Sequence, residues 1–328
     1  MNKAYPACEP YAVHRIRVDA VHELHVEECG NPQGIPVVFL HGGPGSGCNP
    51  DHRRYFNPAC YRIVLFDQRG SGKSLPSGET GQNRTDDLVS DMETIRCHLA
   101  IDRWLLFGGS WGATLALIYL LTHPGNALGV ILRGVFLARE SDLEWFFLSL
   151  RRLFPQAWSR LTQDIRDRSD LAALIDGFYQ AVRDKDATVA LNAARRWSEW
   201  GDAVVTWHRQ TPAQAPAKKQ DTASEMQARQ ERMLAKVRIE THFAKHRYFI
   251  DENEILERIR ELPELPVSIV HGRFDLACTQ EAAWLLHQAL PGSRFIPVAE
   301  AGHLIDEPAM AAALIQETDR MCHLLRSD

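Results

Sequence analysis

Residues 105–121, LLFGGSWGATLALIYLL, hold a serine between two apolar runs of different character. The run before the serine is short and continuous, which is typical of a strand buried on both faces. The run after it is long enough for a helix that ends before Pro124. Residues 108–112, GGSWG, match the pattern G-x-S-x-G. A plain glycine-rich turn would explain the glycines alone, but a strand and a helix on either side are typical of a nucleophile elbow, so Ser110 is the predicted nucleophile.

Strands and helices alternate on both sides of this segment. Continuous apolar runs predict buried strands at 35–41, 61–67, 104–108 and 127–134, and helical spacing predicts helices at 85–100 and 113–123. This alternation is typical of a parallel sheet with right-handed crossovers. Two runs with a period of two precede it, at 11–18 and 22–29, and predict an antiparallel hairpin.

The middle of the chain has a different character. From about Phe136 to Phe249 the sequence predicts helices without a convincing strand, with a mobile loop at 212–224. The α/β pattern then returns, with strands predicted at 265–272 and 293–299 and helices at 280–290 and 308–325. We therefore expect an α/β core formed by residues 1–135 and 250–328, interrupted by a helical cap formed by residues 136–249.

Composition and charge argue against several classes of protein. The chain has 328 residues, of which 45% are hydrophobic and 24% charged, and its net charge is −5. Acidic and basic residues are mixed, so no basic stripe indicates a nucleic-acid partner. The longest apolar run, at 113–121, is too short to span a bilayer, and the first residues lack the apolar segment of a secretory signal. We therefore expect a cytoplasmic protein without a membrane or nucleic-acid partner. The sequence does not indicate whether the protein forms oligomers.

The seven cysteines predict neither a disulfide framework nor a metal site. Their number is odd, they are scattered, and no C-x-x-C pair occurs. We therefore expect reduced thiols. Zinc would require clustered cysteines and histidines, so we expect no bound metal.

A serine nucleophile needs a base, and the base needs an acid that orients it. In the chain order of the elbow fold, the acid comes after the serine and before the histidine. Asp275 follows one predicted strand, and His303 follows the next. Both would lie at the edge of the sheet that carries Ser110, where ligands bind in open α/β sheets. Asp306 and Asp251 are competing candidates for the acid.

The negative charge that develops during attack needs preorganised N–H donors. One predicted donor is the backbone N–H of Trp111, directly after the nucleophile. The other is Gly43, in the segment HGGPGSG at 41–47, because glycines let the backbone approach a substrate closely.

The segment DQRGSGKS, at 67–74, is similar to a phosphate-binding loop. That loop requires glycine at the position of Asp67. We therefore do not expect nucleotide binding.

Six motifs together resemble the proline iminopeptidases, a family of α/β-hydrolase serine peptidases. They are HGGPG at 41–45, DQRGSGKS at 67–74, GGSWG at 108–112, LRG at 132–134, GRFD at 272–275 and AGH at 301–303. The resemblance covers nearly the whole chain. It implies the α/β-hydrolase fold, with a mostly parallel central sheet and an inserted helical cap. It also implies that the protein releases proline from peptides with a free N-terminal proline, through an acyl-enzyme and without a cofactor.

The resemblance implies roles for individual residues. The catalytic roles would fall on Ser110 as nucleophile, Asp275 as orienting acid and His303 as base, with Gly43 and Trp111 as oxyanion donors. Glu240, in the motif RIETH at 238–242, would hold the ammonium group of the substrate. A buried ammonium needs such a paired charge. From sequence alone, Glu240 could equally lie on a solvated helix face.

Two further residues are candidates for the substrate pocket. Arg133, just past a predicted strand, could organise the carboxylates of the pocket. Trp145 of the cap, with Phe146 and Trp197, could form an apolar wall for the proline ring. Packing inside the cap explains each of these aromatic residues equally well.

One carboxylate that the resemblance implies is missing. The family pattern W-S-x-W-E corresponds to WSEWGD at 197–202, with Gly201 in the place of the glutamate. Asp202 is one residue further, about 100° round a helix, and is the predicted substitute. The residues after RIETH also differ, with Phe243 and Ala244 where the family has tyrosine and phenylalanine. The alternative function is therefore an esterase or amidase with altered cap specificity. A non-catalytic binding protein is disfavoured, because every catalytic position is filled.

Overall fold

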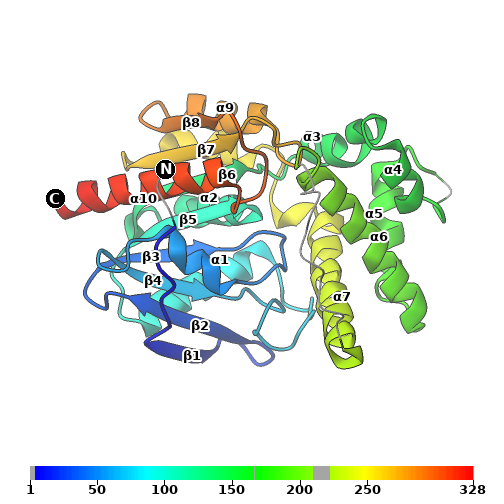
Figure 1. The fold of residues 1–328 in the computed structure, drawn as a ribbon, viewed down its shortest axis with the longest axis horizontal. Helices are drawn as coiled ribbons and strands as arrows, with labels where there is room; N and C mark the ends of the chain where they lie inside the picture. Colours follow the sequence, from blue (N-terminus) through cyan, green and yellow to red (C-terminus); the bar gives the residue numbers. More distant parts are fainter. Residues whose placement is uncertain (1–3, 166, 210–221, 328) are drawn as a thin grey trace.

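The computed structural model describes residues 4–165, 167–209 and 222–327. Its described strands form one sheet in the order β1-β2-β4-β3-β5-β6-β7-β8 (Figure 1). The strands are β1 (Ala12–Arg17), β2 (Glu23–Gly30), β3 (Ile35–Leu40), β4 (Tyr61–Phe66), β5 (Trp104–Ser110), β6 (Ala127–Val135), β7 (Val267–Gly272) and β8 (Arg294–Val298). β2 pairs antiparallel with both β1 and β4, and the other pairs are parallel. The predicted hairpin and the mostly parallel sheet are both confirmed.

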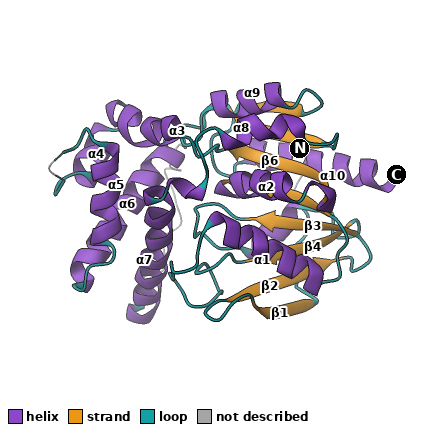
Figure 2. Cartoon of the chain, turned by 180° about the vertical axis from the view of Figure 1, so that it is seen from behind, coloured by secondary structure: helices purple, strands orange, loops and turns teal. Residues whose placement is uncertain are grey.

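Helices cover both faces of the sheet (Figures 1 and 2). These helices are α1 (Thr85–His98), α2 (Trp111–Thr122), α8 (Glu254–Arg258), α9 (Gln280–Ala289) and α10 (Pro308–Ser327). The first four pack on one face, and α10 packs on the other together with a short 3₁₀ helix, Pro50–Tyr55.

The alternation of side chains along the strands explains why these runs are apolar throughout. In β5, Leu105 and Phe107 belong to the same buried cluster as Met310 of α10, whereas Leu106 belongs to the cluster on the opposite face, with Leu115 of α2. Successive strand residues point to opposite faces, so a strand covered on both sides needs apolar residues at every position.

A group of helices between β6 and β7 forms the inserted cap, which lies beside one end of the sheet (Figure 1). Its helices are α3 (Glu140–Glu144), α4 (Pro155–Leu161), α5 (Leu171–Ala181), α6 (Ala187–Val205) and α7 (Ala223–Lys245). We propose that the cap has the boundaries 136–249. Of the predicted loop at 212–224, residues 212–221 lie outside the described residues, and α7 already begins at Ala223.

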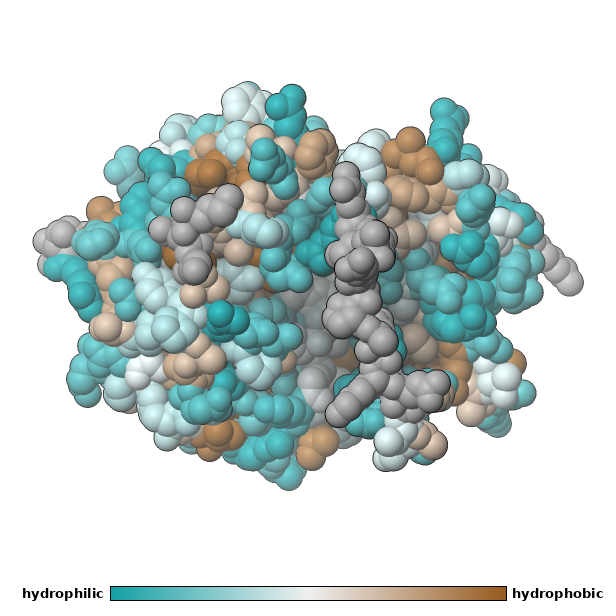
Figure 3. Space-filling model, viewed as in Figure 1, coloured by the Kyte–Doolittle hydropathy of each residue, from teal (hydrophilic) through white to brown (hydrophobic). Residues whose placement is uncertain are grey.

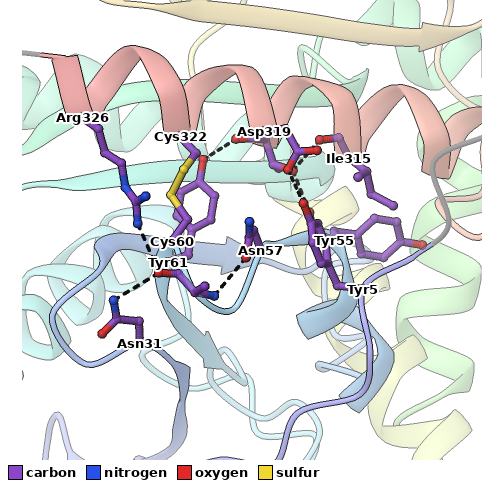
Figure 4. The surroundings of a disulfide bond; sticks show 12 residues. Tyr5, Asn31, Tyr55, Asn57, Cys60, Tyr61, Ile315, Asp319, Cys322 and Arg326 are labelled. Atoms are coloured by element: carbon purple, nitrogen blue, oxygen red, sulfur yellow. Dashed lines mark hydrogen bonds between the residues drawn. A yellow bond between two sulfur atoms is a disulfide. The ribbon is translucent and has the colours of Figure 1, made fainter.

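A disulfide joins Cys60, just before β4, to Cys322 in α10 (Figure 4). The two cysteines are 262 residues apart in the chain, and both are buried. Next to this bond, the hydroxyl of Tyr61 donates to the backbone carbonyl of Thr318 in α10, at 2.5 Å. The expectation of reduced thiols was therefore wrong for this pair. The docking of α10 on the sheet brings them together, and cysteine spacing contains no signal for that.

The face of the molecule seen in Figure 3 is mostly hydrophilic. Its hydrophobic residues lie in small separate groups over the core and the cap. Among the helices that the structure describes, none has both the length and the apolar composition that a membrane span requires.

Candidate active site

Ser110 lies at the end of β5 and directly before α2. Its φ of 56° and ψ of −125° form a strained conformation, of the kind that costs a non-glycine residue about 1–3 kcal/mol. Close packing explains the surrounding glycines. A Cβ atom at Gly108 would collide with the carbonyl of Gly112, and a Cβ atom at Gly112 would collide with the carbonyl of Leu40. The strand, turn and helix predicted around Ser110 are confirmed.

Asp275 and His303 lie in the loops that follow β7 and β8, and they form a hydrogen-bonded pair. His303 Nδ1 is 2.8 Å from Asp275 Oδ2, and both residues are buried. The other oxygen of Asp275 accepts the backbone N–H groups of Ala277 and Cys278, each at 2.9 Å. Burial would raise the pKa of Asp275, but the charge and hydrogen bond of His303 outweigh it and lower this pKa to about 2. The ionised carboxylate therefore orients the imidazole and leaves its Nε2 as the proton acceptor.

The competing acids do not take this position. Asp306 is exposed and forms an ion pair with Arg209 at the surface. Asp251 is also exposed, where the cap returns to the core. Asp275 is thus the acid that the fold places against His303.

A cavity of about 380 Å³ lies between this edge of the sheet and the cap. Six of the residues predicted for the site line it: Gly43, Ser110, Arg133, Asp202, Glu240 and His303. The cap contributes Phe136, Phe146, Phe147 and Trp197 to its wall, and the core contributes Phe39 and Ile305. The site therefore combines an apolar wall with a few polar groups, as small-molecule sites generally do.

The predicted oxyanion donors come from two segments, the start of α2 and the loop that carries Gly43. Trp111 is the first residue of α2, and the first N–H groups of a helix have no acceptor within it. Its buried indole donates to Gln68 Oε1 at 2.9 Å, which holds this end of the helix in place. Gly43 lines the cavity with a φ of 115°, a conformation that favours glycine.

The segment DQRGSGKS braces the loop that carries Gly43. The carboxylate of Asp67 accepts the backbone N–H groups of Cys48 at 2.6 Å and Lys73 at 2.7 Å. Gln68 donates its backbone N–H to Nε2 of His41 at 3.0 Å. It also donates its side-chain amide to the carbonyl of His41 at 2.9 Å. The glycine-rich pattern therefore has a structural explanation, and Asp67 is the residue around which the segment folds.

Two predicted pocket residues make contacts other than the expected ones. The guanidinium of Arg133 donates to the backbone carbonyl of His303, and no described hydrogen bond joins it to Glu240 or Asp202. It therefore supports the histidine loop. The indole of Trp145 lies outside the described lining of the cavity and donates to the carbonyl of Leu276 at 2.8 Å. A partly buried indole N–H needs such an acceptor, and this contact joins the cap to the loop of Asp275.

Glu240 of α7 lies in the cap wall of the cavity. Its Oε2 accepts a hydrogen bond from the indole of Trp197 in α6, at 3.0 Å. Burial raises the pKa of Glu240, while Lys236 and the Trp197 hydrogen bond oppose this shift. Asp202 lies at the exposed rim of the same cavity. The spacing in the sequence did not show that Trp197 and Glu240 would meet.

Sequence reasoning also missed the residues that hold the histidine loop. Glu307 accepts the backbone N–H groups of Gly302 at 2.6 Å and Leu304 at 3.0 Å, on either side of His303. It also lies 2.9 Å from Nε2 of His208, just after α6. The sequence signal that could have pointed to Glu307 was its position directly before Pro308, the first residue of α10. Its partner His208 carried no signal.

Cys278 lies close to the Asp275–His303 pair. Within the described part of the chain, these three residues form the one group of three side chains of metal-ligating type. Burial and the charge of Asp275 raise the pKa of the Cys278 thiol well above its ordinary value. A protonated thiol is a poor nucleophile and a poor metal ligand, so Ser110 is the more suitable nucleophile of the site.

Comparisons with known proteins agree with this geometry. A family model described as alpha/beta hydrolase fold matches residues 35–306. A probable proline iminopeptidase of Leptolyngbya boryana is 42% identical, over 98% of this chain and 97% of its own. The proline iminopeptidase of Xanthomonas citri is 41% identical, over 97% of this chain and 99% of its own. The solved structure of a proline iminopeptidase-related protein of Thermus thermophilus has a TM-score of 0.60 at 23% identity, over 96% of this chain and 99% of its own. This similarity shows that the two proteins share a fold. The chain therefore belongs to the α/β-hydrolase fold family and, within it, to the proline iminopeptidases.

Proposed function

We propose that this chain is a serine aminopeptidase that releases N-terminal proline from peptides. The observation that carries the proposal is the hydrogen bond between Asp275 and His303, because His303 lines the same cap-covered cavity as Ser110. Membership of the proline iminopeptidases supports the choice of substrate.

The proposed reaction proceeds through an acyl-enzyme. His303 Nε2 takes the proton of the Ser110 hydroxyl, and the oxygen attacks the carbonyl carbon of the N-terminal proline. The N–H groups of Gly43 and Trp111 stabilise the oxyanion. His303 then protonates the leaving amine, and the peptide bond breaks. A water molecule, activated by the same histidine, hydrolyses the prolyl ester and regenerates Ser110.

The cap supports a preference for the first residue of a peptide. Its helices cover the cavity, and its side chains offer an apolar wall at Phe146 and Phe147 with a carboxylate at Glu240. The apolar wall suits a proline ring, and Glu240 suits its charged nitrogen. An internal peptide segment would have to pass through the cap helices.

A prolyl arylamide assay tests this function. We expect the wild-type protein to hydrolyse the free prolyl compound faster than other aminoacyl arylamides. Ser110→Ala should lower kcat by at least about 10⁴-fold, because the nucleophile is lost. Circular dichroism checks that the variant is folded. If the wild type leaves prolyl arylamide intact while a phosphonate probe labels Ser110, the catalytic assignment holds and the substrate assignment is wrong.

The location of the protein is a separate question. The sequence predicts a cytoplasmic protein, whereas the buried Cys60–Cys322 disulfide is of a kind that persists in oxidising compartments. Acid quenching of intact cells and alkylation of free thiols in the denatured protein, followed by mass spectrometry of the Cys60 and Cys322 peptides, distinguish the two cases. Full alkylation of both cysteines would support a cytoplasmic location.

A further inference from the structure

The cavity contains a lysine next to the carboxylate proposed to bind the substrate. Lys236 and Glu240 lie one turn apart on α7, and both line the cavity. Lys236 Nζ is 3.5 Å from Glu240 Oε1, while the indole of Trp197 occupies Oε2. In the free protein, both oxygens of Glu240 therefore already have a partner.

The core packs against the backbone of Lys236. A Cβ atom on Gly45 would lie 3.1 Å from the carbonyl oxygen of Lys236 and 3.2 Å from Cβ of Ile239. The loop that carries Gly43 thus packs directly against this turn of α7. This contact fixes the backbone of Lys236 beside the cavity, which its side chain lines.

The charges at this end of the cavity favour a protonated lysine. Glu240 raises the pKa of Lys236, and Asp202 raises it further. Asp142, which also lines the cavity, is already paired with Arg139 at 2.7 Å. Lys236 and Glu240 form an ion pair, so a substrate ammonium has to compete with Lys236 for Glu240.

Gly201 leaves open space in the same wall. It follows Trp197 by four residues, so both lie on one face of α6, and Gly201 also lines the cavity. A Cβ atom at Gly201 would have no atom within 4 Å. The family resemblance implies a glutamate here. The cavity therefore has additional room beside Glu240 and one carboxylate fewer.

We infer that Lys236 is a specificity-determining residue that lets this site also accept substrates whose proline nitrogen is acylated and uncharged. The inference rests on the proposed prolyl hydrolase function and deepens it. The acyl group lies in the space beside Gly201, and its carbonyl oxygen accepts a hydrogen bond from Lys236 Nζ. The bond that breaks is the same one, between the prolyl carbonyl and its leaving group, and water is again the second reactant.

The test compares free and N-acetylated prolyl p-nitroanilide. We expect the wild type to hydrolyse both compounds. Lys236→Met should raise the ratio of kcat/KM for the free compound over the acetylated one by about 10-fold, because Glu240 is released and a like charge is removed. Lys236→Arg should keep the wild-type ratio. Lys245→Met is the matched control on the same helix, because Lys245 pairs with Asp176 away from this cavity and its loss should not change the ratio.

A second variant tests the space beside Gly201. Gly201→Glu should lower turnover of the acetylated compound at least about 10-fold and raise that of the free compound, since it fills the space and adds a carboxylate. A wild type that is inactive on the acetylated compound, or a ratio that is unchanged in Lys236→Met, would overturn the inference without affecting the proposed function.

Binding separates a failure of this inference from a failure of the proposed function. Calorimetry with Ser110→Ala and Ser110→Ala/Lys236→Met gives the affinities for prolinamide and N-acetylprolinamide without turnover. Tighter prolinamide binding in the double variant, by about 10-fold relative to N-acetylprolinamide, supports the role of Lys236 even if neither anilide is hydrolysed. Equal affinity ratios in the two proteins would overturn it.

Discussion

At the scale of single residues, the hydrogen bonds of Asp275 require a carboxylate. Its carboxylate accepts two backbone N–H groups with one oxygen and the imidazole of His303 with the other. An amide at this position would offer an N–H group in place of one acceptor oxygen. It would favour the wrong tautomer of His303, with the proton on Nε2.

We therefore predict that Asp275→Asn lowers kcat by about 10³–10⁴-fold with little change in fold. Steady-state kinetics on the prolyl arylamide measure this loss. Asp306→Asn is the control, because Asp306 is the neighbouring candidate acid and pairs with Arg209 instead. A larger loss from Asp306→Asn than from Asp275→Asn would show that the acid was assigned incorrectly.

At the scale of elements, α7 joins the cap to the core through a buried histidine. His242 Nε2 donates to the backbone carbonyl of Asn83, at 3.0 Å, just before α1. Burial lowers the pKa of His242 from 6.5 to about 4. Between these values the unfolded chain binds a proton that the folded protein excludes. The stability from this residue is therefore complete above about pH 6.5 and is lost as the pH falls toward 4.

We predict that His242→Gln reduces the dependence of stability on pH. Between pH 7.5 and 4, the free energy of unfolding of the wild type should fall by up to about 3 kcal/mol because of His242. Burial also lowers the pKa of His52 to about 4, so His52 should add to this fall. Glutamine keeps an N–H donor but does not titrate, so the free energy of unfolding of the variant should differ less between the two pH values. Urea unfolding at the two pH values measures it. His98→Gln, on the exposed side of α1, should behave like the wild type; an equal pH dependence in all three proteins would contradict the prediction.

At the scale of the whole molecule, the Cys60–Cys322 disulfide links the first third of the core to its last helix (Figure 4). It closes a loop that contains the cap and most of the sheet. A cross-link over so long a loop restricts the unfolded chain strongly.

We predict that Cys60→Ser/Cys322→Ser lowers the free energy of unfolding by about 3–5 kcal/mol. Activity below the unfolding transition should change little, because both cysteines lie on the α10 side of the sheet, outside the cavity lining. Unfolding by urea, with and without dithiothreitol, measures the effect. The double variant should not respond to the reductant, and the exposed Cys97→Ser should respond like the wild type. Equal stability of the oxidised wild type and the double variant would refute a stabilising role.

Much of the fold could be predicted because it depends on local patterns. The apolar runs around Ser110, the hairpin before them and the helices after Phe136 follow from side-chain periodicity over ten to twenty residues. The order of Ser110, Asp275 and His303 could also be predicted, because parallel strands place the residues that follow them at one edge of the sheet.

The contacts between distant segments could not be predicted in the same way. Arg133 meets the carbonyl of His303, and Trp145 meets Leu276, because the cap and the loops of the core fold against one another. Periodicity indicates which face of an element is buried, but not which side chain of another element it meets.

The sequence alone thus established the α/β-hydrolase fold and the resemblance to proline iminopeptidases, since both depend on short motifs in a set order. The three-dimensional arrangement was needed for the disulfide and for the Lys236–Glu240 pair in the cavity. Lys236 and Glu240 are one turn apart in any helix, but only the packing of α7 against the core places that pair in the cavity that Ser110 also lines. Long-range packing of this kind involves residues far apart in the chain, and no local pattern records it.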